Sequence, residues 1–91
     1  MSHTHTILIP EQLRWMAAFE FYRVEGHSLA ECFQCLSTIA PILTMELFDE
    51  NGAPHNFLAV FVNSRKVEHE EFSEALTPDS RIRLNIAASG G

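Results

Sequence analysis

The hydrophobic and polar positions along this chain predict four β-strands. They are Thr4–Pro10, Phe19–Glu25, Phe57–Asn63 and Arg81–Ile86. The first strand ends at Pro10, which cannot continue a sheet ladder, and the second ends before Gly26. These two strands are predicted to form a hairpin. Apolar residues occupy both faces of the third, which predicts a central strand or one exposed apolar face. In the fourth, Ile82, Leu84 and Ile86 alternate with polar residues and are predicted to point inward.

Between the second and third strands, the apolar residues change to helical spacing. Ser28 and Glu31 predict a capping box, in which the hydroxyl accepts from an early helix amide and the carboxylate bonds back to the cap amide. The helix is predicted over Leu29–Ile39 and is broken by Pro41. Its apolar stripe consists of Leu29, Cys32, Phe33, Leu36 and Ile39. A further short turn of helix is predicted over Ile42–Phe48.

The remaining segments have the composition of turns and loops. They are Glu11–Ala18, which is predicted as a loop or a short helical turn, Asp49–Pro54, Asn63–Lys66 and Thr77–Ser80, with at most a short helical turn in Glu68–Leu76. Together these elements predict an α+β domain, residues 1–86, in which a mixed sheet has one main helix on one face. Residues 87–91 carry no side chain able to anchor them, so we expect a flexible tail.

The composition describes one small acidic domain. The 91 residues are 46% hydrophobic and carry a formal net charge of −6. A chain of this length buries one core and leaves little mass for an elaborate active-site cleft, so we do not expect a self-contained enzyme. The scattered cations disfavour nucleic acid and anionic membranes as partners. Without a long apolar run or a secretory signal pattern, the expected protein is cytoplasmic, and we expect it to be monomeric when free.

The cysteines and histidines predict no metal or redox site. Cys32 and Cys35 form a Cys-x-x-Cys inside the predicted helix, whereas redox pairs gain their lowered thiol pKa at a helix N-terminus. Zinc needs two further ligands that the spacing does not supply. We therefore expect buried or half-buried free thiols. His3 and His5 share one face of the first strand and suggest only adventitious copper or nickel binding. Trp15 is expected to close the edge of the core.

Two of the chain's four glycines, Gly90 and Gly91, are its last residues. This pair, the order of elements and three internal motifs resemble the MoaD/ThiS family of ubiquitin-like sulfur carriers. The motifs are Leu13-Arg14, Val24-Glu25-Gly26-His27-Ser28-Leu29 and Phe61-Val62-Asn63. The valine–asparagine pair and the diglycine are the most specific of them. The chain length and the opening Ile9-Pro10, followed by Leu13-Arg14, look closer to the CysO-like carriers of amino-acid sulfur transfer.

The resemblance implies a ubiquitin-like β-grasp fold, with a mixed sheet of four to five strands, and a carrier rather than an enzyme. In this family a MoeB/ThiF-like partner uses ATP to adenylate the terminal carboxylate, here that of Gly91, and sulfur then displaces AMP. The thiocarboxylate donates its sulfur to an accepting enzyme, as in molybdopterin or cysteine biosynthesis, and the carrier itself binds no cofactor. Gly90, with Ala88 and Ser89, keeps the tail thin enough for a narrow tunnel.

A partner-binding surface is predicted on the sheet face that the helix leaves uncovered. Its apolar members are Leu8, Phe57, Ala59 and Phe61. Exposed apolar patches commonly mark partner sites. Alternatively, some of these residues pack under the Asp49–Pro54 loop, or a one-residue register shift exchanges the two faces. Arg81 and Arg83, beside the tail, either pair with acidic groups of the activating enzyme or are solvated cations.

Two other functions remain compatible with these residues. A ubiquitin-like protein modifier would use the same activated carboxylate to form an isopeptide bond with a lysine. A β-grasp interaction domain would not use its terminus at all. Because adenylation precedes both sulfur transfer and ligation, the residues do not distinguish a carrier from a modifier.

Overall fold

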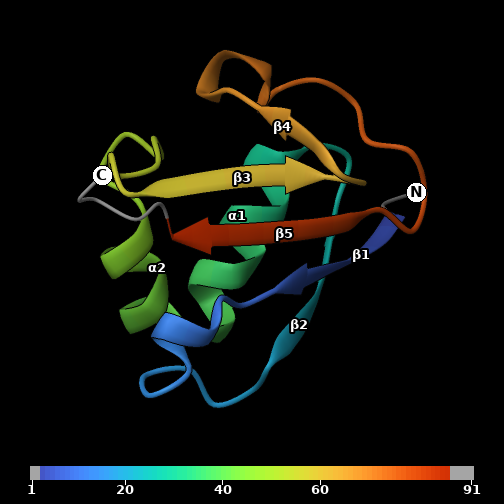
Figure 1. Cartoon of the computed structure of the whole chain (residues 1–91). Helices are drawn as coiled ribbons and strands as arrows, with labels where there is room; N and C mark the ends of the chain where they lie inside the picture. The colour runs from blue at the N-terminus through green and yellow to red at the C-terminus, as the bar shows by residue number, and fades with distance from the viewer. Residues whose placement is uncertain (1–2, 87–91) are drawn as a thin grey trace.

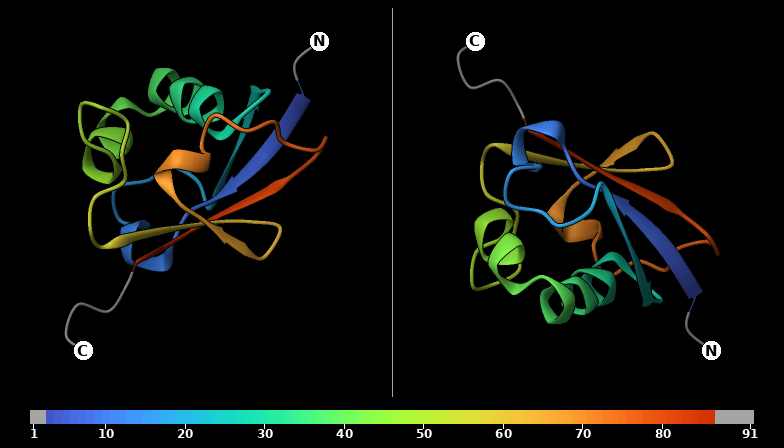
Figure 2. Two further views of the ribbon diagram at one scale, coloured as in Figure 1. Left: turned by 90° about the horizontal axis from the view of Figure 1, so that it is seen from above. Right: turned by 90° about the horizontal axis from the view of Figure 1, so that it is seen from below.

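One five-stranded sheet with two α-helices on the same side makes up residues 3–86, the part of the chain that the computed structural model describes (Figures 1 and 2). The elements in chain order are β1 (His3–Leu8), η1 (Glu11–Leu13), β2 (Phe21–Gly26), α1 (Leu29–Ile39), α2 (Pro41–Leu47), β3 (Leu58–Val62), β4 (Arg65–Val67), η2 (His69–Glu71) and β5 (Arg81–Ile86), where η marks a 3₁₀ turn. The strand order is β2-β1-β5-β3-β4. Among the strands of residues 3–86, only β1 and β5 pair in parallel, so the predicted α+β fold with a mixed sheet is confirmed.

The first helix, α1, begins and ends where the sequence predicts. Its N-cap Ser28 accepts a hydrogen bond from the Glu31 N–H at 3.3 Å through the side-chain Oγ. The Glu31 carboxylate accepts from the His27 N–H at 2.8 Å, not from the cap amide as predicted, so the return bond reaches one residue further back. Pro41 then opens α2 at a position where its missing N–H is not needed. The predicted helical turn is therefore a short helix of its own.

Strand β5 has its predicted bounds, whereas the predicted bounds of the other three strands differ from the observed ones by one or two residues at each end. β1 stops at Leu8, although the next amide, that of Ile9, still donates to Glu20 O at 2.9 Å. β2 begins at Phe21 and not at Phe19. The aromatic residues before β2 belong to the β1–β2 connection, which the composition alone does not separate from a strand.

The sequence prediction missed β4 and assigned its residues to turns and loops. Asn63 and Ser64 have φ angles of 49° and 75°, and they form the two-residue turn that places Val62 opposite Arg65. Positive φ at both turn residues matches the twist of a hairpin, and asparagine tolerates it well. β4 has only three residues, of which Val67 alone is buried. An alternating pattern cannot register over so short a strand.

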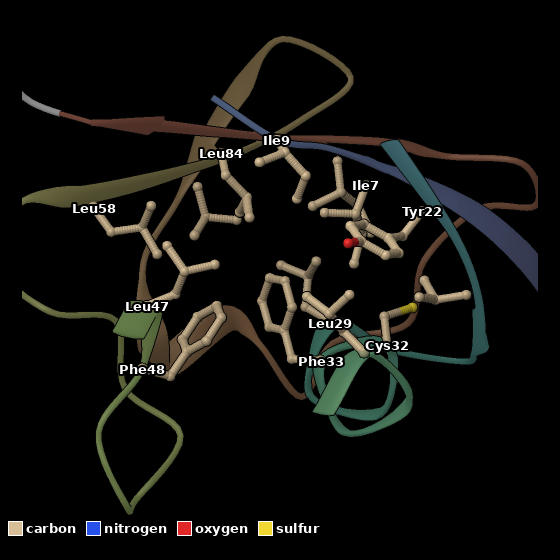
Figure 3. Close-up of a cluster of buried hydrophobic side chains, with 14 of the residues drawn as sticks. Ile7, Ile9, Tyr22, Leu29, Cys32, Phe33, Leu47, Phe48, Leu58 and Leu84 are labelled. Carbon is tan, nitrogen blue, oxygen red and sulfur yellow. The ribbon is translucent and has the colours of Figure 1, made fainter. Parts of the chain in front are cut away.

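The core fills the space between the helices and the inward face of the sheet (Figure 3). Phe33 of α1 lies on the side of the core next to the helices. Its ring centroid is 4.5 Å from that of Phe48 and 5.5 Å from that of Phe72. Trp15 does not close the core: its side chain is 80% exposed, so this prediction is wrong. The 3₁₀ turn η1 directs Leu13 into the core instead, and Trp15 follows on the outside.

A buried histidine ties three parts of the sheet together. His5 of β1 is 0% exposed, and its Nε2 lies 3.0 Å from Gly26 O. Its Nδ1 accepts from the Ser80 N–H at 3.0 Å. Because Nδ1 is an acceptor, the proton of the neutral ring is on Nε2, which donates to the carbonyl. His5 thus links the end of β2 and the start of β5 to β1.

The start of α1 packs so closely on the end of β2 that only glycine fits at position 26. A Cβ atom on Gly26 would lie 2.8 Å from Glu31 Cβ and 2.9 Å from Cys32 N. Both distances are shorter than real Cβ atoms allow, and the contact with Cys32 N is to backbone, which cannot rotate away. The motif that precedes the helix therefore has a packing role.

Candidate functional site

The sheet face turned away from the helices carries a row of side chains that crosses all five strands. Strand pairing places Phe21 opposite Leu8, and Leu8 opposite Arg83. Further along, Phe61 lies opposite both Arg83 and Lys66. The sequence neighbours that point the other way are buried, namely Ile7, Tyr22, Val60, Val67 and Ile82. We define the outer row as the outward-facing residues Phe21, Leu8, Arg83, Phe61 and Lys66; Arg83 stands at its centre, between Leu8 and Phe61.

The outer face also holds the cations that form no ion pair within residues 3–86. The paired cations are Arg14 with Glu20 at 2.7 Å, Arg65 with Glu71 at 2.9 Å and Lys66 with Glu68 at 3.9 Å. Arg23, Arg81 and Arg83 are exposed on β2 and β5 and have no such partner in the described chain. Although the chain has a net charge of −6, the three arginines without an ion pair in residues 3–86 all lie on this face. Such a face is complementary to an acidic partner surface.

A shallow hollow of about 200 Å³ lies on the same face. It is lined by Leu8, Phe61, Asn63, Ser64, Arg81, Arg83 and Asn85. Asn63 holds one wall, because its Oδ1 accepts from the Arg81 N–H at 2.9 Å and its own N–H donates to Arg81 O at 2.9 Å. The asparagine noted in the sequence thus anchors the β3–β4 turn to β5. The hollow is smaller than typical small-molecule sites, so it suits a single side chain of a partner.

The structure brings most of the predicted partner-binding residues to this one face. Those on the face are Leu8, Ala59, Phe61, Arg81 and Arg83. Phe57 is the exception: it precedes β3, packs against the core and stacks on His55 with 5.8 Å between ring centroids. The sequence left open that some of these residues pack away from the exposed patch, and Phe57, which precedes the first residue of β3, does so. The other predicted site residues lie outside the described residues; they are Ala88, Ser89, Gly90 and Gly91.

Three exposed aromatic residues near this face were not predicted as site residues. Phe21 belongs to the outer row and is 50% exposed, while Phe19 and Trp15 are 62% and 80% exposed. Trp15 and Phe19 lie on the β1–β2 connection, at the end of the sheet where β5 reaches Ile86 (Figure 2). The alternation with buried Tyr22 was the signal that places Phe21 on the outer face. For Trp15, no local pattern shows that it lies outside.

The cysteine and histidine positions offer no second site of this kind. Burial raises the pKa of the Cys32 thiol to about 12, with smaller contributions from Cys35 and Glu31. Cys35 is half-buried, and both are free thiols. Both ring nitrogens of His5 are occupied by backbone partners, so the predicted adventitious pair with His3 is not available. Within residues 3–86, no three His, Cys, Asp or Glu side chains are grouped to hold a metal ion.

None of the helices described here has the length and apolar character needed to cross a membrane.

Sequence comparison finds no matching protein-family model and no matching curated protein. Several solved structures do match the fold. Small archaeal modifier protein 1 from Methanosarcina acetivorans has a TM-score of 0.80 and 18% identity, covering 100% of this chain and 99% of that chain. CysO from Mycobacterium tuberculosis has a TM-score of 0.79 and 20% identity, covering 92% and 99%. The BexX/CysO complex from Amycolatopsis orientalis contains a chain with a TM-score of 0.72 and 23% identity, covering 96% and 99%.

These likenesses show that the chain has the ubiquitin-like β-grasp fold. The predicted fold, including a mixed sheet of up to five strands, is confirmed. The expected resemblance to CysO-like proteins is confirmed for the fold as well, since almost the whole of each chain is covered.

Proposed function

We propose that this chain is a sulfur-carrier protein that works through the carboxylate of Gly91. One observation carries the proposal: a domain with the fold of CysO continues from β5 into a short segment of small residues that ends in Gly90-Gly91. Five residues follow Ile86, and a chain of that length spans at most about 17 Å. A partner that binds Gly91 must therefore approach the domain itself.

The chemistry requires activation of the carboxylate. Charge and resonance protect the carbon of a carboxylate from nucleophiles, so a MoeB/ThiF-like enzyme first transfers AMP from ATP to Gly91 and releases pyrophosphate. A hydrosulfide ion then attacks the acyl carbon, the bond to the AMP oxygen breaks, and AMP leaves. The product is a thiocarboxylate. A sulfur-accepting biosynthetic enzyme removes the sulfur, and hydrolysis restores the carboxylate, so the chain acts as a co-substrate.

The outer row, together with the neighbouring Arg81, supplies the docking surface for the activating enzyme in this proposal. Leu8 and Phe61 provide apolar contact, and Arg81 and Arg83 pair with acidic groups of the enzyme. Charged groups of this kind mainly raise the rate of encounter and select the partner. The small residues Ala88, Ser89 and Gly90 let the tail enter a narrow channel to the nucleotide.

Intact mass measurement tests the proposal directly. The full chain is incubated with ATP, a MoeB/ThiF-like enzyme from the same organism and sodium sulfide. We expect the mass of the chain to rise by the difference between one sulfur and one oxygen atom. Gly90→Val should abolish both this change and ATP–pyrophosphate exchange while the circular dichroism spectrum is unchanged. Pyrophosphate exchange that is equal for Gly90→Val and the parent chain would refute the role of the tail.

A protein modifier is the second candidate, and the likeness to small archaeal modifier protein 1 favours it. In that case the Gly91 adenylate is attacked by a lysine amine, which forms an isopeptide bond and releases AMP. The same incubation, with a cell extract of the source organism added, separates the two functions. A modifier yields covalent adducts that carry the Gly91 remnant on lysine, whereas a carrier yields only the thiocarboxylate. An interaction domain yields neither product and keeps its partner after deletion of Gly90 and Gly91.

A further inference from the structure

A groove of about 910 Å³ lies on the helical side of the domain, away from the outer row. Its walls come from α1, from α2 and from the loop that follows α2, and η2 closes one end. The floor is formed by the edges of three core aromatic residues, Phe33, Phe48 and Phe72, which are 7%, 6% and 4% exposed. The ring centroid of Phe33 lies 4.5 Å from that of Phe48 and 5.5 Å from that of Phe72. Met45, which is 72% exposed, stands on one wall. The groove thus presents apolar surface without a covering element in the described chain.

Three acidic side chains line the groove, and no lysine or arginine does; two histidines, His55 and His69, also line it. The acidic side chains are Glu31, Asp49 and Glu50, and none of them forms an ion pair within residues 3–86. The segment between Arg23 and Arg65, which contributes most of the lining, contains no lysine or arginine. The two sides of the domain therefore differ in sign: the sheet face carries the unpaired arginines, and the groove carries unpaired carboxylates.

We propose that this groove binds a basic amphipathic segment of a partner protein, with apolar side chains on the aromatic floor and lysines or arginines against the acidic rim. A helix laid in an apolar groove is a recurrent mode of peptide recognition. The volume is within the range of specific ligand sites. Because the groove lies on the opposite side from the outer row, such a partner leaves that face free for a second protein. The proposal does not depend on the chemistry of Gly91.

A second copy of this chain is a poorer occupant. Within residues 3–86 the arginines without an ion pair lie on the outer face, and a contact between groove and outer face is heterologous. Such a contact produces rings or open chains of molecules, not a two-fold dimer. The net charge of −6 also repels one copy from another.

The test uses the full chain and two synthetic 14-residue helical peptides. One has leucine at positions i, i+3, i+4 and i+7 with lysine on the flanks, and the other has glutamate in place of each lysine. Peptide binding is followed by amide chemical shifts in ¹⁵N-labelled protein and by calorimetry at low and high salt. We expect the lysine peptide to shift the amides of the groove and to bind more weakly as salt increases, and the glutamate peptide not to bind.

Two matched pairs of variants locate the site. Glu50→Lys reverses a charge on the rim, and Glu46→Lys makes the same change on exposed α2 outside the groove. Ser37→Trp fills the groove from α1, and Thr38→Trp places the same ring beside it; both parent hydroxyls bond to Gln34 O. We expect Glu50→Lys and Ser37→Trp to weaken binding about fivefold or more, and their controls to change it less than twofold.

Several results would overturn the proposal. Equal effects of Glu50→Lys and Glu46→Lys would mean general attraction between opposite charges. Equal binding of the two peptides would mean that the acidic rim plays no part. Amide shifts confined to the outer face would mean that the groove does not bind the peptide. Amide shifts that depend on protein concentration in the absence of peptide would mean that the groove binds a second copy of the chain. Each variant is accepted only if its thermal midpoint matches that of its control.

Discussion

Replacement of His5 should reveal how much of the fold depends on one buried imidazole. The change His5→Leu keeps an apolar side chain of moderate size but removes both hydrogen bonds, to Gly26 O and from the Ser80 N–H. Each buried backbone group left without a partner costs about 1–3 kcal/mol, so the two together cost about 2–6 kcal/mol. A domain of this length has a total stability of about 5–14 kcal/mol. His5→Leu should therefore remove a large part of the free energy of unfolding.

Two further substitutions separate the hydrogen bonds of His5. Asparagine places an oxygen near the position of Nδ1 and keeps the acceptor for Ser80, whereas glutamine places an amide N–H near Nε2 and keeps the donor for Gly26. Urea denaturation gives the free energy of unfolding, and hydrogen exchange gives the protection of the Ser80 amide. We expect this amide to lose protection in His5→Leu and His5→Gln but to keep it in His5→Asn. The reasoning fails if His5→Leu costs less than about 0.5 kcal/mol with the Ser80 amide still protected.

Three further predictions address packing, ionisation and docking. Gly26→Ala should cost about 1–3 kcal/mol in thermal denaturation, because the added Cβ meets Glu31 Cβ at 2.8 Å. At neutral pH a maleimide should modify Cys35 and leave Cys32 unmodified until the chain unfolds. Because the folded-state pKa of Cys32 is raised from 9.0 to about 12, stability should be full below about pH 9 and fall as the pH rises toward 12, where only the unfolded chain ionises easily. Arg83→Glu should raise the KM for the chain in ATP–pyrophosphate exchange about tenfold and change kcat little.

Each of these predictions has a matched control. Gly52→Ala adds a methyl group with no atom within 4 Å, although its φ of 81° strains alanine, so any destabilisation there must come from the backbone. Cys32→Ser should remove the alkaline loss of stability. Arg65→Glu makes the same charge change on the opposite face of β4, and an equal effect on KM would argue against docking through the outer row.

How much the sequence predicts depends on how local the signals are. α1 and β5 were predicted with their observed bounds, because capping, a proline break and regular alternation are all contained within a few neighbouring residues. β4 was missed because three residues cannot show a period. The exposure of Trp15 was missed because the path of η1, not the chemistry of tryptophan, decides which side chain enters the core.

The candidate site was predictable only in part for the same reason. Alternation within β3 and β5 places Phe61 and Arg83 on an outer face, and this placement agrees with the structure. The register between strands is non-local, so the contact of Leu8 with Arg83 follows only from the strand order. The groove depends on how two helices and a loop pack together, and no motif in the sequence indicates it. Whether the outer row binds an activating enzyme stays a prediction.

The parallel pairing of β1 with β5 affects how the protein is made. The central partners come from opposite ends of the described chain: His5 and Ser80 are 75 positions apart. Contacts at such separation form late, because a long loop must close first. A ribosome delivers β1 first and β5 last, so the sheet stays split into two hairpins until Arg81–Ile86 is released. We expect products that lack Arg81–Ile86 to leave β1 and β3 without their shared neighbour, and therefore to be cleaved by proteases more easily than the complete sheet.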